Sequence, residues 1–331
     1  MKDKWDFLLS EFRRFGGIAD NIYQKEGEYG RGIFPINSNL KTRILTPSKL
    51  LFKKDEIYLE DNKLRMSKDG NYNEEEKNFF NFYQDNFSWH SGGKETTELF
   101  EKGLSLFSSN LKKLIKEFAM VDIDLRHKGS WDNVIKNQFL NSRAVKFRGT
   151  SVIAPIWDLV NHRVNSLNFI INKDGISTPN YPASNCEIRH SYGYMSPLKC
   201  FFSYGFFSEE SIVFSFPLSI NIEDLGISIF CKGSSLKDDS MKIVRTGNQI
   251  ILDGLPIADA NHQKLPYDYF YEIIKRIGDI TLSKDLLPRI FEYNISIRKK
   301  ILDASDLVDN EVSKILCKVL HYEISLISYY D

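Results

Sequence analysis

The chain has 331 residues, of which 42% are hydrophobic and 13% aromatic, enough to bury a sizeable core without staples. Its 44 lysines and arginines balance its 44 aspartates and glutamates, which excludes the basic footprint of a dedicated nucleic-acid or anionic-membrane binder. The N-terminal residues MKDKWDFLLSEF lack the apolar stretch of a signal peptide, and no window approaches the ~20 apolar residues that cross a bilayer. We expect a cytoplasmic monomer.

The four cysteines are widely separated and form no CxxC or CxxH spacing. They are Cys186, Cys200, Cys231 and Cys317. Neither a zinc site nor a disulfide framework is indicated by this spacing. We expect four reduced thiols in the core and no bound metal.

The first half of the chain begins with a helix and continues in short extended segments. Trp5, Leu8, Leu9 and Phe12 recur at helical spacing before the glycines at 16 and 17, which predicts a short amphipathic helix with a glycine stop. Extended segments follow at 32–36, 43–52 and 63–67, separated by Asn, Asp and Gly. From about 72 to 140, apolar residues at three- and four-residue spacing predict a helical insert.

The second half returns to β-like sequence before it ends in helices. Extended runs are predicted at TSVIAPIWDLV (150–160), LNFII (167–171), CEIRH (186–190), LKCFFSYGFF (198–207), SIVFSF (211–216), ISIFC (227–231) and NQIILD (248–253). Beyond Pro266 the apolar residues again follow helical spacing to the end of the chain. The sequence therefore predicts β segments, a helical insert, further β segments and a helical C-terminal lobe.

Two segments before residue 150 contain residue types that bind ligands. EYGRGIF (28–34) places Gly30 and Gly32 before an extended run, where glycine allows a sharp turn or a close approach to a ligand. The third glycine and the helix of a dinucleotide fingerprint are missing, so taken alone the segment favours a tight turn. Arg143, in NSRAV (141–145), favours a helix C-cap or a solvent position; the alternative is a guanidinium that binds a carboxylate.

Two later segments place polar groups in apolar surroundings. APIWDLVNH (154–162) contains Asp158 and the pair Asn161 and His162, and such groups need partners when they are buried. Asn and His also commonly close a turn at a strand end. In FFSYGFF (201–207), Tyr204 lies between two pairs of phenylalanines, where packing is the simpler interpretation.

The order and spacing of these segments resemble the SET-domain methyltransferases. YGRG lies near the start, SRA follows the helical insert, DLVNH begins fifteen residues beyond Arg143, and the SYG tyrosine follows His162 by forty-two residues. The branch most similar has a helical insert and a helical C-terminal lobe, and is typified by Rubisco large-subunit lysine methyltransferase and the actin histidine methyltransferase. DLVNH with the spaced SYG is the strongest part of the resemblance.

The resemblance implies an α+β fold: a SET core of short curled β-sheets with pseudoknot-like threading, a helical insert and a mainly helical C-terminal lobe. The implied boundaries are 1–67 for the N-terminal part of the SET core, 68–140 for the insert, 141–217 for the C-terminal part with the cofactor and catalytic motifs, and 218–331 for a substrate-binding lobe of short strands and then helices.

The resemblance also implies a cofactor, S-adenosylmethionine, and a role for each motif residue. Tyr29, Gly30, Arg31, Arg143, Asn161 and His162 would bind the cofactor, Tyr204 would be the catalytic tyrosine, and Asp158 and Phe216 would lie on the substrate side. The implied reaction transfers a methyl group to a side-chain nitrogen of a protein, with lysine expected and histidine as the second acceptor.

Three positions depart from the family pattern. Arg163 stands where many relatives have Ser, SPLK (196–199) replaces a Gly-Glu turn, and Phe216 in SFPL replaces a second pocket tyrosine. Loss of that tyrosine weakens the case for lysine, and the actin histidine enzyme lacks it as well. Two alternatives stay open: a catalytically inactive SET-like scaffold that binds a protein, and a methyltransferase that acts on a small molecule or peptide.

Overall fold

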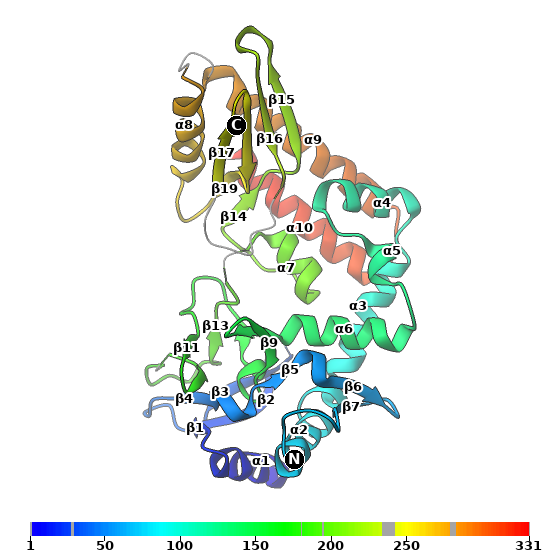
Figure 1. The fold of residues 1–331 in the computed structure, drawn as a ribbon, viewed down its shortest axis with the longest axis vertical. Helices are drawn as coiled ribbons and strands as arrows, with labels where there is room; N and C mark the ends of the chain where they lie inside the picture. The colour runs from blue at the N-terminus through cyan, green and yellow to red at the C-terminus, as the bar shows by residue number, and fades with distance from the viewer. Residues whose placement is uncertain are drawn as a thin grey trace. The chain divides into compact units, whose positions relative to one another are not determined.

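A computed structural model describes residues 2–27, 30–179, 181–193, 195–233, 242–278 and 283–330. The chain forms two compact units. The first comprises Met1–Leu99 and Gly129–Gly193, and the second comprises Phe100–Lys128 and Tyr194–Asp331. Figure 1 labels the helices and strands of both units.

The first unit contains several small sheets. A four-stranded antiparallel sheet has the order β1 (Ile18–Asp20), β4 (Arg43–Pro47), β12 (Gly175–Ser177) and β11 (Ile170–Asn172). The other sheets pair β2 (Ile22–Gly27) with β3 (Gly30–Pro35), β6 (Ile57–Glu60) with β7 (Lys63–Met66), and β5 (Phe52–Lys53) with β9 (Thr150–Ile153) and β8 (Val145–Phe147). A two-residue pair, β10 (Asn161–His162) with β13 (Arg189–His190), is parallel.

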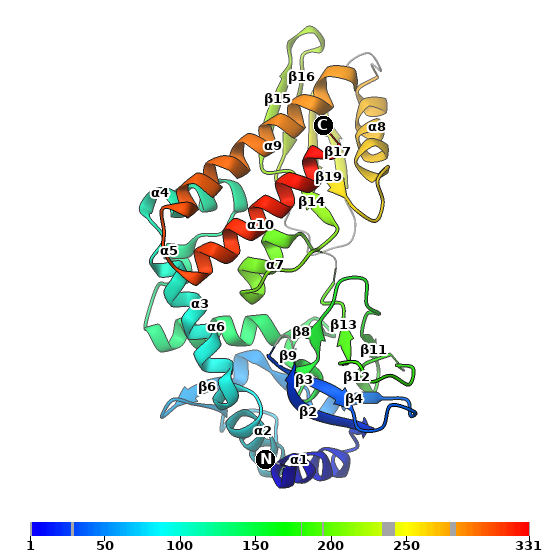
Figure 2. The ribbon, with the colours of Figure 1, turned by 180° about the vertical axis from the view of Figure 1, so that it is seen from behind.

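Helices α1 (Lys2–Arg14) and α2 (Glu74–Asn86) lie side by side in both ribbon views (Figures 1 and 2). They share an aromatic contact, with the rings of Phe12 and Phe79 stacked at 6.2 Å between centroids. Both rings belong to one buried cluster that includes residues of β1, β3, β4 and β9. Burial of these faces is the main stabilisation of the unit, since apolar area removed from water contributes about 25 cal/mol per Å².

The helical stretch predicted from about 72 to 140 is present. After α2 it contains α3 (Lys94–Ser105), α4 (Ser109–Leu114), a π-helical turn η4 (Ile115–Ala119), α5 (Ile123–Arg126) and α6 (Trp131–Arg143). Local signals set the ends: Asn73 and Glu76 form a capping box at the start of α2, and the Ser130 side chain accepts from Asn133 N at the start of α6. Arg143 is the last residue of α6, as predicted.

The second unit contains a larger sheet and the C-terminal helices. The sheet has the order β15 (Leu218–Ile222), β16 (Ile227–Cys231), β18 (Gln249–Asp253) and β17 (Lys242–Thr246), and a separate pair joins β14 (Ile212–Phe214) to β19 (Pro256–Asp259). The helices after residue 196 are α7 (Pro197–Tyr204), α8 (Leu265–Ile277), α9 (Ser283–Asp306) and α10 (Glu311–Ser328).

Two apolar clusters stabilise the second unit. In one, α8 covers the strands β16, β18 and β19, and both ribbon views show α8 beside this sheet (Figures 1 and 2). In the other, α7, α9 and α10 pack with residues of α3, α4 and η4. Inside the second cluster Arg298 of α9 and Glu323 of α10 form an ion pair with 2.8 Å between Nε and Oε2.

The prediction of an extended run at 198–207 is wrong, because Pro197–Tyr204 is helix α7. Ser196 caps the helix by accepting from Lys199 N, Pro197 occupies its first turn, and Gly205 ends it with φ +82°. Serine, proline and glycine at these positions are the standard signals of a short helix. They outweigh the aromatic residues that favoured a strand.

Two further predictions need correction. The segment before Asn161 is not one long strand, because Trp157–Leu159 forms a 3-10 turn, η5, between β9 and β10. All four cysteines are free as predicted, but Cys186 is exposed and Cys317 only half-buried, so only Cys200 and Cys231 are core thiols.

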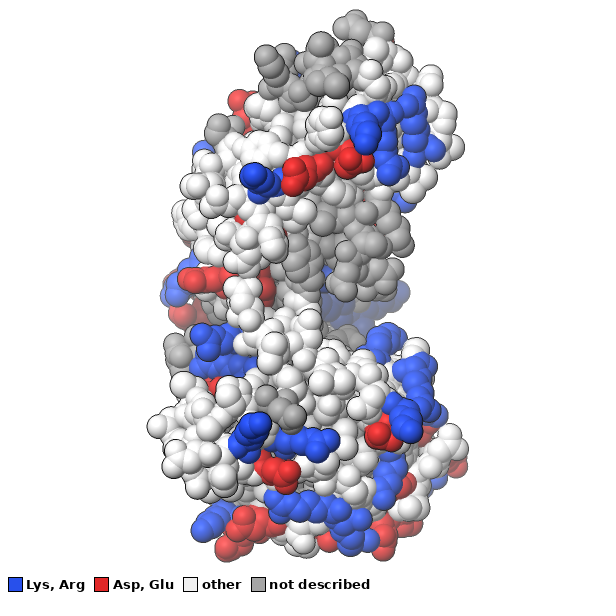
Figure 3. Space-filling view, turned by 90° about the vertical axis from the view of Figure 1, so that its left-hand side faces the viewer, with Lys and Arg blue, Asp and Glu red and all other residues white. Residues whose placement is uncertain are grey.

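The predicted α+β class is confirmed: small, mostly antiparallel sheets are followed by C-terminal helices. Within the described ranges no helix is both long enough and apolar enough to cross a bilayer. Figure 3 shows one face of the molecule, on which basic and acidic side chains are interspersed among uncharged ones.

Candidate active site

The pair Asn161 and His162 lies where three distant parts of the first unit meet. Strand β10 pairs in parallel with β13, so that Asn161 lies opposite Arg189 and His162 opposite His190. The segment just before β13 also contacts β3, since Ile188 N donates to Ile33 O at 2.8 Å. β10 and β3 therefore each contact the 187–190 segment.

The Asn161 side chain joins these segments. Its Nδ2 donates to Arg31 O at 3.2 Å and to Glu187 Oε1 at 2.6 Å. The other carboxylate oxygen of Glu187 accepts from Arg189 Nε at 2.8 Å. A Cβ on Gly32 would lie 2.0 Å from Glu187 Oε1 and 3.0 Å from Asn161 Nδ2, so the second glycine of YGRG leaves room for this hydrogen bond.

His162 is held by the segment that follows β13. Its Nδ1 accepts from Tyr192 N at 3.1 Å, so the neutral ring carries its proton on Nε2. The rings of His162 and Tyr192 lie 4.9 Å apart, and Tyr192 Oη donates to Val160 O at 3.2 Å. The phenol of Tyr192 is thus held against the chain that leads into β10.

Asp158 is paired with a tyrosine from α2. Tyr83 Oη donates to Asp158 Oδ1 in a short hydrogen bond, while Asp158 Oδ2 is buried with no hydrogen-bond partner in the described parts of the chain. Burial raises the pKa of Asp158 to about 6, although the hydrogen bond from Tyr83 and the charge of Arg143 both lower it. Burial likewise raises the pKa of Tyr83, so the phenol keeps its proton and donates.

Arg143 approaches the same carboxylate from the end of α6. Its guanidinium lies 4.0 Å from the centroid of the Phe139 ring, and Nη1 donates to Ser142 Oγ at 3.1 Å. Burial lowers the pKa of the Arg143 guanidinium. The negative charge of the Asp158 carboxylate raises this pKa and partly offsets the effect of burial. Arginine stays protonated at neutral pH in spite of this, so a half-buried cation faces a buried anion.

The backbone beside Asp158 is strained. Ile156, directly before η5, has φ +69° and ψ −46°, a conformation that β-branched residues rarely adopt. Such strain costs about 1–3 kcal/mol and clusters at functional sites. The turn places Trp157 with its ring centroid 4.6 Å from that of His190.

His190 is neutral at physiological pH. Its side chain is 1% exposed, and burial lowers its pKa to about 4, with a further lowering from the nearby His162. His162, His190, Trp157 and Tyr192 form an aromatic wall beside Asn161.

The structure describes all but one of the predicted site residues. Tyr29 lies outside the described residues. Gly30, Arg31, Arg143, Asp158, Asn161 and His162 belong to the first unit, where Asn161 contacts the Arg31 carbonyl and Asp158 interacts with Arg143. Gly30 is exposed with φ +83°, and Arg31 pairs with Glu26 at 3.1 Å.

Tyr204 and Phe216 belong to the second unit. Tyr204 is the last residue of α7, and burial with the nearby Cys200 and Glu210 raises its pKa to about 12. Phe216 is 4% exposed; its ring lies 4.1 Å from the Arg298 guanidinium, and its backbone N donates to Asn294 Oδ1. Their roles in catalysis and substrate binding stay predictions.

Sequence reasoning missed three residues around Asn161 and Asp158. Tyr83 and Glu187 reach them from 75 and 26 residues away, and no local pattern signals such contacts. Tyr192 did carry a signal, because the triplet Ser-Tyr-Gly occurs twice, at 191–193 and at 203–205. No group of three or more His, Cys, Asp or Glu suited to a metal ion is found among the residues that the structure describes.

The fold resembles that of SET-domain methyltransferase structures, the family that the sequence motifs also resemble. The SET domain of LSMT bound to lysine and AdoHcy matches with a TM-score of 0.45 and 13% identity over 99% of this chain and 90% of that one. Rubisco LSMT bound to AdoMet matches with a TM-score of 0.46 and 13% identity. Rubisco LSMT bound to sinefungin and monomethyllysine matches with a TM-score of 0.42 and 12% identity, and the coverage of both chains is the same in each match.

These matches describe a likeness of fold at low identity, and with TM-scores below 0.5 they assign no residue a role. No protein-family model matches the chain, and no curated protein matches it either.

Proposed function

We propose that the chain is an S-adenosylmethionine-dependent methyltransferase that modifies a side-chain nitrogen of a protein, with lysine as the expected acceptor and histidine as the second. The observation that carries the proposal is the junction at Asn161, where Asn161 Nδ2 donates to both the Arg31 carbonyl and the Glu187 carboxylate. Two motifs that the sequence resemblance marks as cofactor-binding, 130 residues apart, are joined at this point.

The residues near this junction suit the amino-acid part of the cofactor. The Arg143 guanidinium has donor groups beyond its bond to Ser142, which suits an α-carboxylate. The orphaned Asp158 Oδ2 is a buried acceptor that suits an ammonium group. S-adenosylmethionine, when bound, supplies a methyl group on a sulfonium sulfur.

The protein's part in such a reaction is positioning and electrostatics. A nitrogen acceptor must be uncharged to attack, and desolvation against aromatic side chains lowers the pKa of an ammonium group. A protonated phenol presents its oxygen lone pairs to a polarised methyl group, and holding donor and acceptor in line contributes to the rate. His190, which is neutral at physiological pH, adds no charge to this wall.

Two tyrosines are candidates for the phenol. Tyr204 is the one that the spacing of the motifs predicts. Tyr192 is the one favoured by contact, because its backbone and phenol both bind the 160–162 segment. We propose Tyr192 as the second candidate on this observation.

Calorimetric titration with S-adenosylmethionine and S-adenosylhomocysteine tests the proposal. We expect binding by the wild type and at least tenfold weaker binding by Asn161→Ala, since the variant loses the hydrogen bonds to Arg31 and Glu187, worth about 1.4 kcal/mol or more. Asn133→Ala, an exposed asparagine on α6, is the matched control and should bind as the wild type does. No binding by the folded wild type would favour the inactive scaffold instead.

Tyr192→Phe and Tyr204→Phe separate the two tyrosine assignments. Each substitution removes a single oxygen, so affinity for S-adenosylhomocysteine should change little, while methyl transfer to protein acceptors should fall in the variant whose phenol serves the reaction. Labelled methyl transfer into a cell lysate gives the measurement. Unchanged transfer in both variants would refute a catalytic tyrosine.

A further inference from the structure

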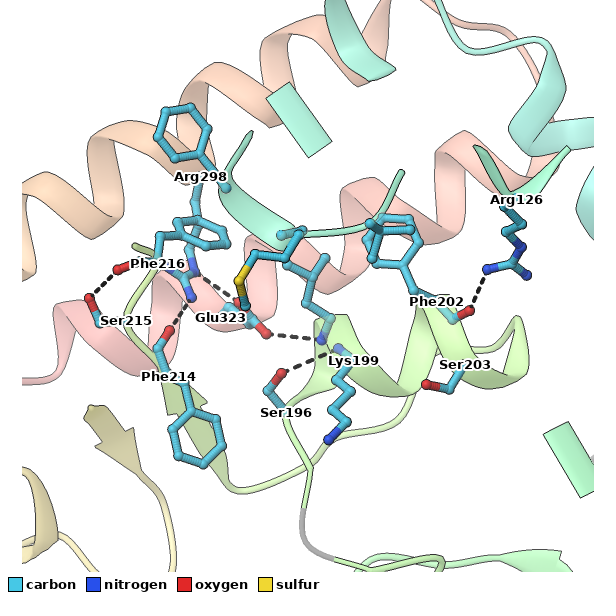
Figure 4. Close-up of a pocket in the computed structure, with 15 residues that line it drawn as sticks. Arg126, Ser196, Lys199, Phe202, Ser203, Phe214, Ser215, Phe216, Arg298 and Glu323 are labelled. Carbon is cyan, nitrogen blue, oxygen red and sulfur yellow. Dashed lines mark hydrogen bonds and ion pairs between the residues drawn. The ribbon is translucent and has the colours of Figure 1, made fainter. Parts of the chain in front are cut away.

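The second unit contains a half-enclosed cavity of about 280 Å³. Its lining comes from residues 118–121 at the end of η4, from α7, from β14 and the segment after it, and from α9 and α10. The close-up shows the lining side chains, with the Phe216 ring beside Arg298 and with Phe202 on α7 (Figure 4). This volume lies near the lower end of the range for small-molecule sites and is enough for two fused rings.

The charges in the cavity wall are paired within the wall. Arg298 Nε binds Glu323 Oε2 at 2.8 Å, and Nη2 donates to Phe214 O at 2.9 Å. The remaining oxygen of Glu323 accepts from Leu198 N at 3.0 Å. Both side chains are almost completely buried, so a ligand with its own charge would meet a neutralised wall.

Arg126, the second arginine of the lining, is also paired with a carboxylate. Arg126 binds both oxygens of Glu101, a carboxylate with no exposed surface, and donates to Phe202 O at 2.9 Å. The Lys199 side chain extends away from Phe202 and Phe216 in Figure 4. An ionic ligand beside Arg126, Arg298 and Glu323 would lose its hydration without gaining a free counter-charge from them, which is costly.

The rest of the lining contains aromatic rings and a polarisable thioether. Phe118, Phe202, Phe214 and Phe216 contribute rings, and Met120 contributes a thioether. Such groups favour flat rings, because aromatic side chains make favourable offset or edge contacts with another ring and a thioether sulfur makes favourable contacts with an aromatic ring.

The segment beside the opening has features found at binding sites. It follows a π-helical turn, a rare element that is frequent at functional sites. Met120 then adopts φ +57°, which is strained for a residue other than glycine, and its apolar side chain is 44% exposed. Its methyl group approaches Gly233, where an added Cβ would lie 2.9 Å from it.

We propose that this cavity binds a small, uncharged, planar ring compound of one or two fused rings. The proposal does not depend on the proposed methyltransferase activity, because it rests only on residues of the second unit. The neutralised wall selects against ions, the phenylalanines select for flat rings, and Met120 covers the bound ring at the opening.

Methionine-methyl NMR of the full chain tests the proposal, with indole as the neutral probe. The chain has five methionines, and Met120→Leu assigns the signal of interest. We expect indole to shift the Met120 methyl signal saturably, while the signal of Met66, buried in the first unit, stays in place. Indole-3-carboxylate and tryptamine, which add a negative or a positive charge to the same ring, should bind at least about tenfold more weakly.

Cavity-filling variants provide a second test of whether indole binds in this cavity. Ala119→Phe and Val121→Phe each place a ring in the lining, so the indole-dependent shift should disappear, with the dispersion of the other methyl signals confirming the fold. Leu125→Phe adds the same ring at a side chain that is 65% exposed and should bind indole as the wild type does. A saturable shift that survives both filling variants, equal binding of the charged analogues, or no saturable shift at all would overturn the proposal.

Discussion

Gly32 leaves the space that the hydrogen bond between Asn161 and Glu187 occupies. Gly32→Ala would bring a methyl group to 2.0 Å from Glu187 Oε1, and the Glu187 side chain is only 3% exposed, so it must leave its present position. We expect a loss of about 1–3 kcal/mol in the free energy of unfolding and weaker cofactor binding, as for Asn161→Ala. Urea unfolding and calorimetric titration measure the two effects.

Gly149→Ala is the control for Gly32→Ala. Gly149 has φ +82° and no atom within 4 Å of an added Cβ, so its substitution carries only the backbone cost of about 1 kcal/mol. It should leave cofactor binding intact. Equal loss of binding in both variants would contradict the role given to Gly32.

Asp158 makes the stability of the protein depend on pH. The pKa of its carboxyl is about 6 in the folded chain against an ordinary value of 3.8, so between these values the folded state binds more protons than the unfolded state. Stability from this group is therefore complete at about pH 4 and is lost as the pH rises through 6, by up to about 3 kcal/mol. Tyr83 and Arg143, which face the carboxyl, do not titrate in this range.

Asp158→Asn isolates this effect, because asparagine does not titrate. Urea unfolding at pH 4, 5, 6 and 7 should give a stability difference, wild type minus variant, that falls up to pH 6 and then stays constant. A difference that is flat or that rises with pH would show that the carboxyl is not desolvated as described.

At the scale of elements, α9 and α10 are joined by a buried ion pair whose two members depend on each other. Arg298→Met leaves the Glu323 carboxylate buried without its counter-charge, which should cost about 3–5 kcal/mol in the free energy of unfolding. The double variant Arg298→Met with Glu323→Gln removes both charges and keeps an acceptor for Leu198 N. We expect it to recover most of the loss in a denaturant titration.

The exposed pair Lys314 and Glu311 on α10, 2.9 Å apart, is the matched control for this cycle. Lys314→Met should change stability by no more than about 0.5 kcal/mol. A single Arg298→Met variant as mild as Lys314→Met would mean that Glu323 is not held in the ionised form.

Some helices are predictable from local sequence patterns alone. The helix at 2–14 and the helix ending at Arg143 followed from apolar spacing and caps that lie within the segment itself. The prediction of a strand at 198–207 is wrong because Ser196, Pro197 and Gly205 define the ends of helix α7, and these helix signals outweigh the preference of the aromatic residues for a strand. All three signals are visible in the sequence.

At the scale of the whole molecule, the buried clusters of the two units share no residue. Ile44→Ala removes a fully buried side chain from the first core, and Leu316→Ala removes one from the second. Each should cost about 2–5 kcal/mol and raise amide hydrogen exchange mainly within its own unit. Exchange that rises equally in both units for either variant would contradict separate cores.

The α+β class and the order of its segments were predictable because composition, periodicity and motif order are properties of the sequence alone. The side chains that contact Asn161 and Asp158 in the candidate site were not predictable in this way. Tyr83, Glu187 and Gly32 act through contacts with residues 26 to 155 positions away, and a single sequence contains no local record of such contacts.

The junction at Asn161 also has a consequence for synthesis. Its three strands come from residues 30–35, 161–162 and 189–190, so no growing chain shorter than about 190 residues can complete it. Closing such long loops is slow, because their entropy is lost before the contacts that compensate for it are made. A growing chain therefore has α1 and α2 in place well before the junction at Asn161 forms, and the junction is complete only after residue 190 has left the ribosome.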